Sequence, residues 1–483
     1  MGAPAPAGAA ATMDGVPLAV DLDGTLIRSD LLMESLAGAL KRNPFTVFRL
    51  PLWLAHGRAR LKSELAKRCD VDVALLPYDP AVLRELRRQR SEGRWLILAT
   101  ASDRSLAQRV ADHLGIFDDV IASDGARNLK REAKARALTE RFGEAGFDYM
   151  GEDRHDVPVW RHAREAYVVG SDSLAAGARA AGKPVHVIPR EAPRAATLAR
   201  ALRVYQWAKN ILLLVPLLTA HVLFDPDALL AAVFAFVAFS LAASSVYVAN
   251  DVADLQDDRR HPTKRARPLA SGELSIGYAM ILAPALLAAA LALATLLPVE
   301  FAFLLATYLA MNLAYSLGLK RVPLLDVFVL AGLYTLRILA GAAAVDVPVS
   351  HWLLAFSLFA FLSLALAKRF VEVSNVAARE ESRVGGRGYV AGDGDLLAML
   401  GVACAGLSAL VFALYITNPQ VVVLYSAPAI LWIAVPVLLY WMSRVWFLAH
   451  RGELHEDPLL FALRDPASYV TGLVVVAVVI AAT

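Results

Sequence analysis

Residues 249–272 read ANDVADLQDDRRHPTKRARPLASG, and this stretch decides the class of protein to which the chain belongs. Asp251, Asp254 and Asp258 recur at helical spacing, so their carboxylates are expected to share one helix face. Like charges on one face repel each other unless cations bind them. The arginines and lysines that follow, among them Lys264 and Arg267, suit phosphate oxygens. The stretch therefore predicts a site for a diphosphate carried by Mg²⁺.

The regions on both sides of this stretch contain long apolar segments. Hydrophobic residues make up 57% of the 483, which is more than a soluble protein carries. A helix needs about 20 apolar residues to cross a bilayer. Such segments begin near Arg203, Asp227, Ile276, Glu300, Pro323, His351, Leu396, Val422 and Pro466. The sequence thus predicts an all-α bundle of nine transmembrane helices over residues 203–483.

The connections between these segments alternate in charge. One set contains the arginine-rich stretch above, LKR, the residues from KRF to GGRGY, and SRVWFLAHRGELHEDP. The other set, AHVLFDPD, LLPVE, DVPVS and TNPQ, contains no lysine or arginine. Lysine- and arginine-rich loops of a membrane protein stay in the cytoplasm, which places the first set of connections there. We expect an integral protein of the cytoplasmic (inner) membrane. Nine spans then leave residues 1–200 in the cytoplasm and Thr483 on the far side.

Residues 1–200 alternate charged and apolar segments, as a soluble domain does. Residues 1–15 are small and proline-rich but lack the basic start of a secretory signal, so we interpret them as a disordered tail. A soluble domain is predicted over residues 16–190 and a linker over 191–202. Cys69 and Cys404 fall in different domains, which argues against a disulfide framework and against a thiolate metal site.

Polar residues end several apolar strands of the soluble domain. In VPLAVDLDGTLIRSD (16–30), Asp21 and Asp23 follow a strand, and RWLILATASD (94–103) ends in a hydroxyl-bearing segment that includes Thr100. FDYMGEDRHD (147–156) ends in acids, among them Glu152 and Asp156. Strands with polar carboxyl ends, separated by helical stretches, predict a doubly wound α/β sheet whose site lies at the strand ends.

These motifs, together with Lys134 in KARALTERF, resemble the haloacid dehalogenase-like (HAD-like) phosphohydrolase family over residues 16–190. The resemblance implies that Asp21 is the nucleophile and Asp23 the general acid and base. It implies that Thr100 and Lys134 bind the phosphoryl group. Lys130 is an alternative to Lys134 as the phosphate-binding lysine. A Mg²⁺ site would comprise Asp21, Asp23, Glu152 and Asp156, although the family more often has Asp at the position of Glu152.

Between the first two motifs lies RNPFTVFRLPLWLAHGRARLK (42–62), an apolar stretch with interspersed arginines. Its simplest interpretation is a small helical cap over the phosphatase site. A cap that touches the membrane surface is the alternative.

Asn250-Asp251-x-x-Asp254-x-x-x-Asp258 resembles the first signature of UbiA-type prenyltransferases, and this resemblance covers residues 200–483. It implies that the three aspartates bind Mg²⁺ and act in catalysis, with Asn250 beside the substrate. RVYQWAKNILLLVP (203–216) resembles the family's entry to its first helix, which makes Lys209 and Asn210 candidate site residues, with Lys209 a candidate for substrate binding. Snorkelling at the membrane interface explains Lys209 equally well.

The second signature departs from the family pattern, which has acids four residues apart. Here the residue four positions after Asp326 is Leu330. Arg337 lies deeper in the span, where a charged side chain is expensive and is therefore a functional candidate. The stretches YSLGLKRVPLLD and AKRFVEV resemble the polyprenyl-phosphate phosphoribosyltransferase branch. The branch adds further candidates for substrate binding: Tyr315, Lys320, Asp326, Arg337, Lys368 and Arg369, besides Lys264 and Arg267.

The first hypothesis is thus a Mg²⁺-dependent membrane enzyme that moves a 5-phosphoribosyl group from phosphoribosyl pyrophosphate to a polyprenyl phosphate. The tethered phosphatase would then remove the 5-phosphate of the product. One alternative is prenyl transfer from a prenyl diphosphate to an aromatic or other small acceptor, with a regulatory HAD-like domain. Another is a transporter or lipid-binding protein, although transporter sites usually lie near the middle of the membrane. Nucleic acid is not an expected partner, and the oligomeric state stays open.

Overall fold

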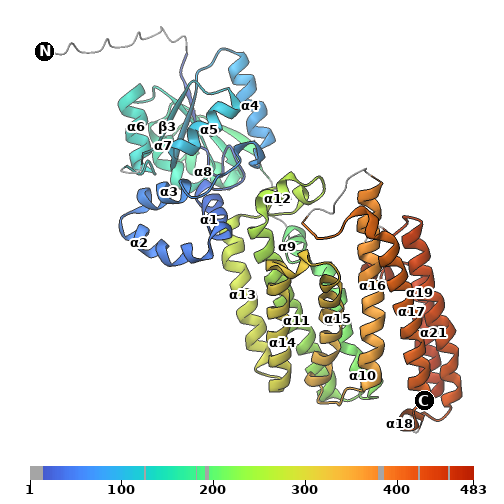
Figure 1. Ribbon diagram of the computed structural model, residues 1–483. Coiled ribbons are helices and arrows are strands. Elements are labelled where there is room, and N and C mark those ends of the chain that lie inside the picture. Colours follow the sequence, from blue (N-terminus) through green and yellow to red (C-terminus); the bar gives the residue numbers. More distant parts are fainter. Residues whose placement is uncertain are drawn as a thin grey trace. The chain divides into compact units, whose positions relative to one another are not determined.

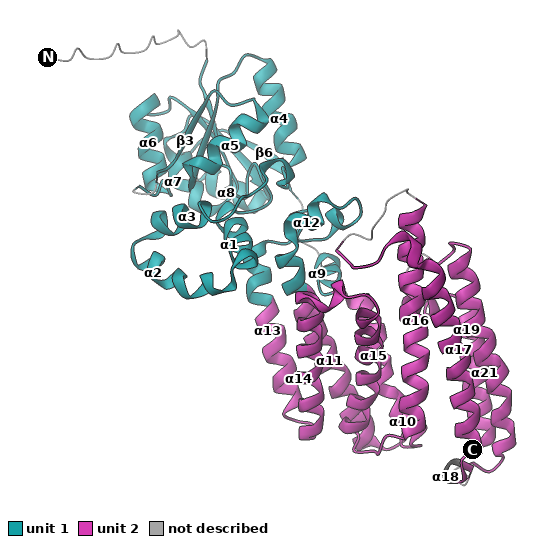
Figure 2. Cartoon of the chain, in the orientation of Figure 1, with its two compact units in different colours: residues 1–202, 248–282 teal, residues 203–247, 283–483 magenta. Residues whose placement is uncertain are grey.

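The computed structural model describes residues 15–124, 127–180, 182–190, 195–378, 386–422, 425–454 and 457–483 (Figure 1). The chain forms two compact units (Figure 2). The first comprises Met1–Leu202 and Val248–Leu282, and the second comprises Arg203–Tyr247 and Ala283–Thr483. The predicted tail lies outside the described residues except for Gly15, as do residues 191–194 of the predicted linker.

A six-stranded parallel sheet, in the order β3-β2-β1-β4-β5-β6, forms the centre of the first unit. Its strands are β1 (Leu18–Val20), β2 (Leu96–Asp103), β3 (Asp119–Ser123), β4 (Asp148–Gly151), β5 (Ala166–Gly170) and β6 (Val185–Pro189). The predicted doubly wound α/β fold is confirmed. The strand order reverses beside β1, so the carboxyl ends of β1 and β4 flank the point where such sheets bind ligands.

Helices connect the strands and cover the sheet (Figure 1). They are α4 (Pro80–Ser91), α5 (Arg104–Leu114), α6 (Glu132–Phe142), α7 (Val157–His162) and α8 (Asp172–Arg179). Between β1 and α4, the chain forms α1 (Leu31–Arg42), the 3-10 helix η1 (Pro44–Arg49), α2 (Leu50–Ala55) and α3 (Arg58–Ala66). The chain therefore has a helical cap where the sequence predicts one.

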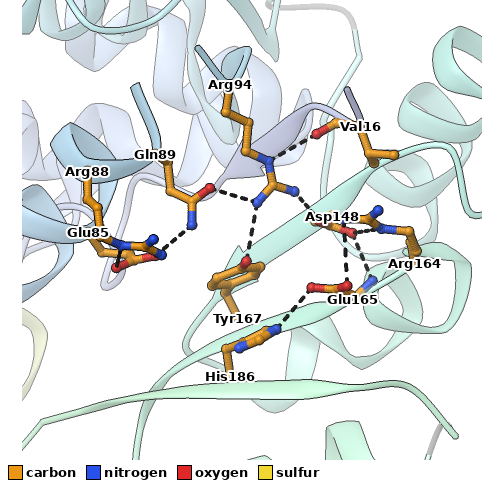
Figure 3. A network of polar contacts seen from close by, with 10 residues as sticks. All are labelled: Val16, Glu85, Arg88, Gln89, Arg94, Asp148, Arg164, Glu165, Tyr167 and His186. Atoms are coloured by element: carbon orange, nitrogen blue, oxygen red, sulfur yellow. Dashed lines mark hydrogen bonds and ion pairs between the residues drawn. The ribbon is translucent and has the colours of Figure 1, made fainter. Parts of the chain in front are cut away.

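A buried polar network closes the amino-terminal ends of the strands (Figure 3). The carboxylate of Asp148, at the start of β4, is fully buried and accepts hydrogen bonds from Arg94 and from Arg164 Nη2, the latter at 2.7 Å. Arg94 Nε also donates to the backbone oxygen of Val16 at 3.0 Å. A buried charge needs such partners. The network stabilises the amino-terminal end of the sheet. The residues that follow β1, among them Asp21, lie at the opposite end.

The first unit also contains α9 (Ala195–Ala201), the end of α11 (Pro226–Ala253), α12 (Leu255–Arg260), the 3-10 helix η5 (Lys264–Ala266) and the start of α13 (Ile276–Ala294). The aspartate-bearing stretch thus belongs to the same compact unit as the α/β domain.

The second unit is helical. It contains η4 (Val204–Leu214), α10 (Val215–Thr219), most of α11 and α13, α14 (Val299–Leu317), α15 (Leu325–Ala344), α16 (His351–Ala377), α17 (Gly394–Thr417), α18 (Pro419–Val422), η8 (Pro428–Ile433), α19 (Ala434–His450), α20 (Pro458–Ala462) and α21 (Pro466–Ala482). Short 3-10 turns, η6 (Leu319–Arg321) and η7 (Ala391–Asp393), precede α15 and α17. The spans in α15 and α16 are each 61% buried, the highest share among the candidate spans, so charges on them need partners inside the protein.

Seven helices in the described part of the chain are long and apolar enough to cross a membrane, so the chain is a multi-pass membrane protein. They begin close to seven of the nine predicted starts. The first predicted span consists of 11 residues of 3-10 helix and 5 of α-helix, with Pro216 near the junction, and the last is a 17-residue helix. The count of nine stays a prediction.

Candidate active sites

Carboxylates from β1 and β4 meet at the carboxyl ends of these two strands. Asp21 and Asp23 directly follow β1, and Glu152 follows β4. Gly24 has φ +76°, and a Cβ atom there would lie 2.2 Å from Glu152 Oε1. Only glycine combines this backbone conformation with so close an approach. The DLDGT motif therefore makes a tight turn that brings Glu152 beside the two aspartates.

Lys134 supplies the positive charge of this pocket. Its Nζ lies 2.9 Å from Asp21 Oδ1 and 3.9 Å from Asp156 Oδ1, and it donates a hydrogen bond to Tyr149 Oη at 2.8 Å. Burial lowers the pKa of Lys134, but Asp21 and Asp156 raise it more, so its pKa is higher than usual. Lys134 is therefore a buried cation in contact with Asp21, while its sequence competitor Lys130 lines the cavity.

Asp23 has a proton affinity suited to acid–base chemistry. Its Oδ1 accepts a hydrogen bond from the Leu31 backbone at 2.8 Å, and its Oδ2 accepts one from the Ser102 hydroxyl. Burial, and next the nearby charge of Asp30, raise the pKa of Asp23 to about 7. A carboxyl with this pKa gains and loses a proton near neutral pH.

Glu152 and Asp156 also have raised pKa values, because their surroundings disfavour the ionised form. Burial and neighbouring carboxylates raise the pKa of Glu152 to about 7 and that of Asp156 to about 6. A divalent cation would relieve this repulsion, and carboxylate oxygens are the ligands that Mg²⁺ prefers. The donor chemistry therefore fits the metal. Among the described residues, however, no three or more His, Cys, Asp and Glu side chains form a group that could hold a metal ion.

Thr100, which the sequence predicts to bind the phosphoryl group, lies inside the domain in β2. It is fully buried, and its hydroxyl accepts a hydrogen bond from the Ser102 backbone at 3.0 Å. The cavity is lined instead by the next residue, Ala101. Thr100 thus orders the end of β2 from within the domain.

Two residues of the pocket carry no sequence signal. Lys62, on the cap helix α3, donates a hydrogen bond to the Ala101 backbone oxygen at 2.5 Å, and burial lowers its pKa. Arg190 follows β6 and donates to the backbone oxygens of Gly24 and Thr25, the latter at 3.0 Å. Neither belongs to a motif, because each reaches the site from an element that only the fold brings close.

A cavity of about 1540 Å³ opens in front of these side chains, within the first unit. One wall consists of the acids Asp21, Asp23 and Glu152 with Lys134. Residues 195–198 and 200 of α9, and residues 272–278, which lead into the first turn of α13, also line the cavity. The phosphatase-like pocket therefore opens toward the segments that connect the α/β domain with the membrane helices.

The aspartate-bearing stretch forms a second charged cluster in the first unit. Asp251 and Asp258 are both buried and both accept hydrogen bonds from Arg267 Nη1, at 3.1 and 2.6 Å. Asp254 lies between α11 and α12, is half exposed, and lies 3.6 Å from Nζ of Lys41, a cap residue. The structure therefore brings Asp251, Asp258 and Arg267 together and pairs Asp254 with a different cation.

The remaining candidates of this stretch lie around the cluster. Asn250 occupies the last turn of α11, where its backbone oxygen accepts a hydrogen bond from Asp254 N at 2.8 Å. Lys264 is exposed in η5.

In the second unit, two predicted lysines converge on one acid. Lys209 of η4 and Lys368 of α16 lie 2.9 and 3.0 Å from Asp457 Oδ2. The hydroxyl of Tyr334 donates to the same carboxylate at 3.3 Å. Lys209 is therefore paired inside the protein and does not snorkel. Asp457 carries no sequence signal because it lies far along the chain, between α19 and α20.

Arg337 is buried in α15 beside these residues. Its Nε donates to Asn210 Oδ1 at 2.9 Å, and its Nη2 donates to Tyr308 Oη at 3.2 Å. Its guanidinium carbon lies 5.5 Å from the ring centroid of Tyr334. A charge in a membrane span is expensive, and these partners compensate for its burial.

Asp326 and Arg369 form a separate, fully buried pair, with Arg369 Nε 2.5 Å from Asp326 Oδ2. Asp326 Oδ1 accepts a hydrogen bond from Tyr389 Oη at 2.6 Å. Tyr315 Oη accepts a hydrogen bond from Arg369 Nη2 at 2.9 Å. Lys320 lies in η6, half-buried. Asp326 thus lies in a buried group of charges with Arg369 and Arg387, and its part in substrate binding stays a prediction.

Comparison with known proteins assigns both parts of the chain. Residues 211–464 match the model of the UbiA prenyltransferase family, and residues 18–161 match that of haloacid dehalogenase-like hydrolases. An uncharacterized protein, y4nM of Sinorhizobium fredii, is 41% identical over 464 residues, which are 95% of this chain and 90% of that protein.

Two further relatives have functional names. Nodulation protein NoeC of Azorhizobium caulinodans is 38% identical over 276 residues, 57% of this chain and 89% of that protein. Decaprenyl-phosphate phosphoribosyltransferase of Mycobacterium tuberculosis is 41% identical over 182 residues, 37% of this chain and 60% of that protein.

Proposed function

Because the chain belongs to the UbiA prenyltransferase family and carries an N-terminal haloacid dehalogenase-like hydrolase domain, we propose that its two activities act in sequence. The transferase moves a 5-phosphoribosyl group from phosphoribosyl pyrophosphate to a polyprenyl phosphate. The phosphohydrolase then removes the 5-phosphate of that lipid product. Both activities depend on Mg²⁺.

The choice of donor rests on similarity and on charge. A relative named decaprenyl-phosphate phosphoribosyltransferase shares 41% identity over 182 residues. Phosphoribosyl transfer involves a donor with a diphosphate and a 5-phosphate, and an acceptor that is itself a phosphate. Lys209, Arg337 and Lys368 are three cations held near one another in the second unit through shared partners, Asp457 and Tyr334. Such a group suits substrates that carry several phosphates.

In the transfer, an oxygen of the lipid phosphate forms a bond to C1 of the ribose. The bond from C1 to the diphosphate oxygen breaks, and the diphosphate leaves with the electron pair. Asp251, Asp254 and Asp258 would hold Mg²⁺, which neutralises charge on the leaving diphosphate. Arg267 bridges two of these carboxylates, so it lies where it would contact a phosphate oxygen of the leaving diphosphate.

In the hydrolysis, the Asp21 carboxylate attacks phosphorus, and the bond from phosphorus to the ribose O5 breaks. Asp23 donates a proton to that oxygen and later takes one from the water that cleaves the aspartyl-phosphate. The raised pKa of Asp23, about 7, suits both steps. Lys134 lies beside Asp21, where it would stabilise charge on the phosphoryl oxygens.

The single observation that supports sequential action is the cavity of the first unit. The acids of the phosphatase pocket and residues 272–278, at the start of a membrane helix, line the same space. We therefore propose that the ribosyl group of the membrane-anchored lipid enters this cavity to reach Asp21. A phosphatase that acts on a soluble metabolite would gain nothing from a cavity lined by the start of a membrane helix.

The test is mass spectrometry of the lipid made in membranes by the wild type and by Asp21→Asn. The wild type should yield ribosyl polyprenyl phosphate, and the variant should accumulate the lipid that keeps the 5-phosphate. Identical lipids from both proteins would reject sequential action.

The family name favours a second candidate, transfer of a prenyl group from a prenyl diphosphate to an aromatic or other small acceptor. Purified protein supplied with each donor decides between them. Diphosphate release from phosphoribosyl pyrophosphate that requires lipid phosphate belongs to the first function alone.

We also propose an orientation in the cytoplasmic (inner) membrane. The charge of the connections supports a cytoplasmic α/β domain and a C-terminus on the far side.

A further inference from the structure

The exposed apolar side chains of the α/β domain gather in one short segment of the cap. Between residues 15 and 202, every large hydrophobic residue that the structure shows as exposed lies between residues 45 and 54. Phe45 and Phe48 are 73% and 77% exposed, and Val47, Leu52 and Leu54 accompany them. We call residues 44–55, which form η1 and α2, the apolar cap segment.

This segment is folded, and local contacts fix the position of its apolar outer face. The Asn43 side chain caps η1 by accepting a hydrogen bond from Phe45 N at 3.0 Å. Trp53 points inward and packs in a cluster with Ala39 and Leu65. The rings of Phe45 and Phe48 stack, with centroids 6.5 Å apart. The segment therefore already buries one apolar face against the cap and holds a second apolar face outside.

The surroundings of this face are basic. Residues 41–60 include five lysines and arginines and no Asp or Glu, and four of the arginines are exposed: Arg42, Arg49, Arg58 and Arg60. Exposed aromatic and aliphatic side chains among arginines are the composition of segments that lie in the interface of an anionic bilayer.

The cap is attached to a helix that crosses the membrane. A Cβ atom at Gly277, in the first turn of α13, would lie 3.9 Å from Sδ of Met33 in α1, the helix that precedes the apolar cap segment. Figure 2 shows α2 and the first turns of α13 at the same end of the first unit, away from α4 and α6. We propose that the apolar cap segment inserts into the headgroup region of the anionic bilayer that α13 crosses.

Because Met33 of α1 lies against Gly277 in the first turn of α13, insertion would need no separate association step. Insertion of the apolar cap segment would orient the first unit on the membrane surface through a second contact, besides the one that the transmembrane helices make. The proposal concerns a binding surface and does not depend on which lipid the transferase modifies.

Site-specific quenching in proteoliposomes tests it. Phe48→Cys in a Cys69→Ser/Cys404→Ser background is labelled with an environment-sensitive fluorophore and reconstituted in vesicles of phosphatidylcholine with phosphatidylglycerol. The matched control carries the label at Arg87→Cys, an exposed position on α4. Vesicles that also contain lipids with a nitroxide quencher near the headgroup give the readout.

We expect the label at residue 48 to shift to the blue and to lose most of its fluorescence to the quencher, while the label at residue 87 does neither. Arg42→Gln/Arg49→Gln should weaken the quenching more in vesicles with phosphatidylglycerol than in vesicles without it. Equal quenching at residues 48 and 87 would overturn the proposal. A blue shift that grows with protein density, in the absence of quenching, would overturn the proposal and would indicate contact with a second copy.

Discussion

Glu34 of α1 and Arg259 of α12 form a buried ion pair with two hydrogen bonds, from Nη2 to Oε1 at 2.6 Å and from Nη1 to Oε2 at 3.0 Å. The two side chains are 0% and 3% exposed. Arg259 directly follows Asp258 in the sequence. The phosphatase cap therefore holds the helix that carries one of the proposed Mg²⁺ ligands.

Glu34→Gln should loosen this contact. It leaves the Arg259 guanidinium buried without its counter-charge, at a cost of roughly 3–5 kcal/mol. Amide hydrogens of α1 and α12 should exchange faster, as hydrogen–deuterium exchange measures, and the transferase should need more Mg²⁺.

Asp72→Asn is the matched control, because it removes the exposed pair between Asp72 and Arg260. Such a pair contributes about 0–1 kcal/mol. Exchange rates that are equal in Glu34→Gln and wild type would show that the ion pair does not hold the two helices together.

Asp251→Asn and Asp258→Asn should each lower transferase turnover by at least about a hundredfold, as expected when charge stabilisation of the leaving group is lost. Diphosphate release from phosphoribosyl pyrophosphate measures it. Asp257→Asn, an exposed change on α12 beside Asp258, should turn over like the wild type. Unchanged turnover in either of the first two variants would remove the assignment of these aspartates to metal and diphosphate.

Lys62 should make phosphate affinity depend on pH. Burial lowers its pKa, so as the pH rises it loses its proton earlier than an ordinary lysine. We expect the KM for a phosphomonoester to rise under alkaline conditions in the wild type. Lys62→Arg should move this rise to higher pH, and Lys62→Met should have a high KM at all pH values.

Lys67→Met serves as control, since Lys67 lies on the exposed surface just after α3. A pH profile that is the same for wild type and Lys62→Arg would exclude Lys62 from phosphate binding.

Asp326→Asn should act on stability. It leaves Arg369 fully buried with a weakened partner, so we expect a loss of up to roughly 3–5 kcal/mol in stability and a lower unfolding temperature in detergent. Asp346→Asn, an exposed change in the loop after the same helix, should leave the unfolding temperature unchanged. If Asp326→Asn unfolds like the wild type but loses turnover, Asp326 belongs to the active site, as its sequence position first indicates.

Membrane orientation is testable by labelling of single cysteines in intact cells. A cysteine at Pro348, in a connection without lysine or arginine, should react with an impermeant reagent added outside, and one at Thr263 should react only after the cells are opened. The reverse pattern would invert the proposed sides of the membrane.

The sequence by itself determined that an α/β domain precedes a helical membrane region, and it supplied the acidic residues that we propose for the two sites. DLDGT after an apolar strand predicts a turn at a sheet edge, because Gly24 must adopt a positive φ there. The positions of Asp251, Asp254 and Asp258 predict a charged helix end, because helical spacing is a local property of the chain. Length and apolar content predicted nine spans, and seven of these are helices long and apolar enough to cross a membrane in the described part of the chain.

Only the tertiary structure decided which charges meet. Lys62 reaches Ala101 from the cap, Asp457 pairs with Lys209 from 248 residues away, and Glu34 meets Arg259 from 225 residues away. No spacing rule connects such positions, since long-range pairing depends on how helices and strands pack. The same packing turned Asp254 toward Lys41 while Asp251 and Asp258 share Arg267, a distinction that helical periodicity does not contain.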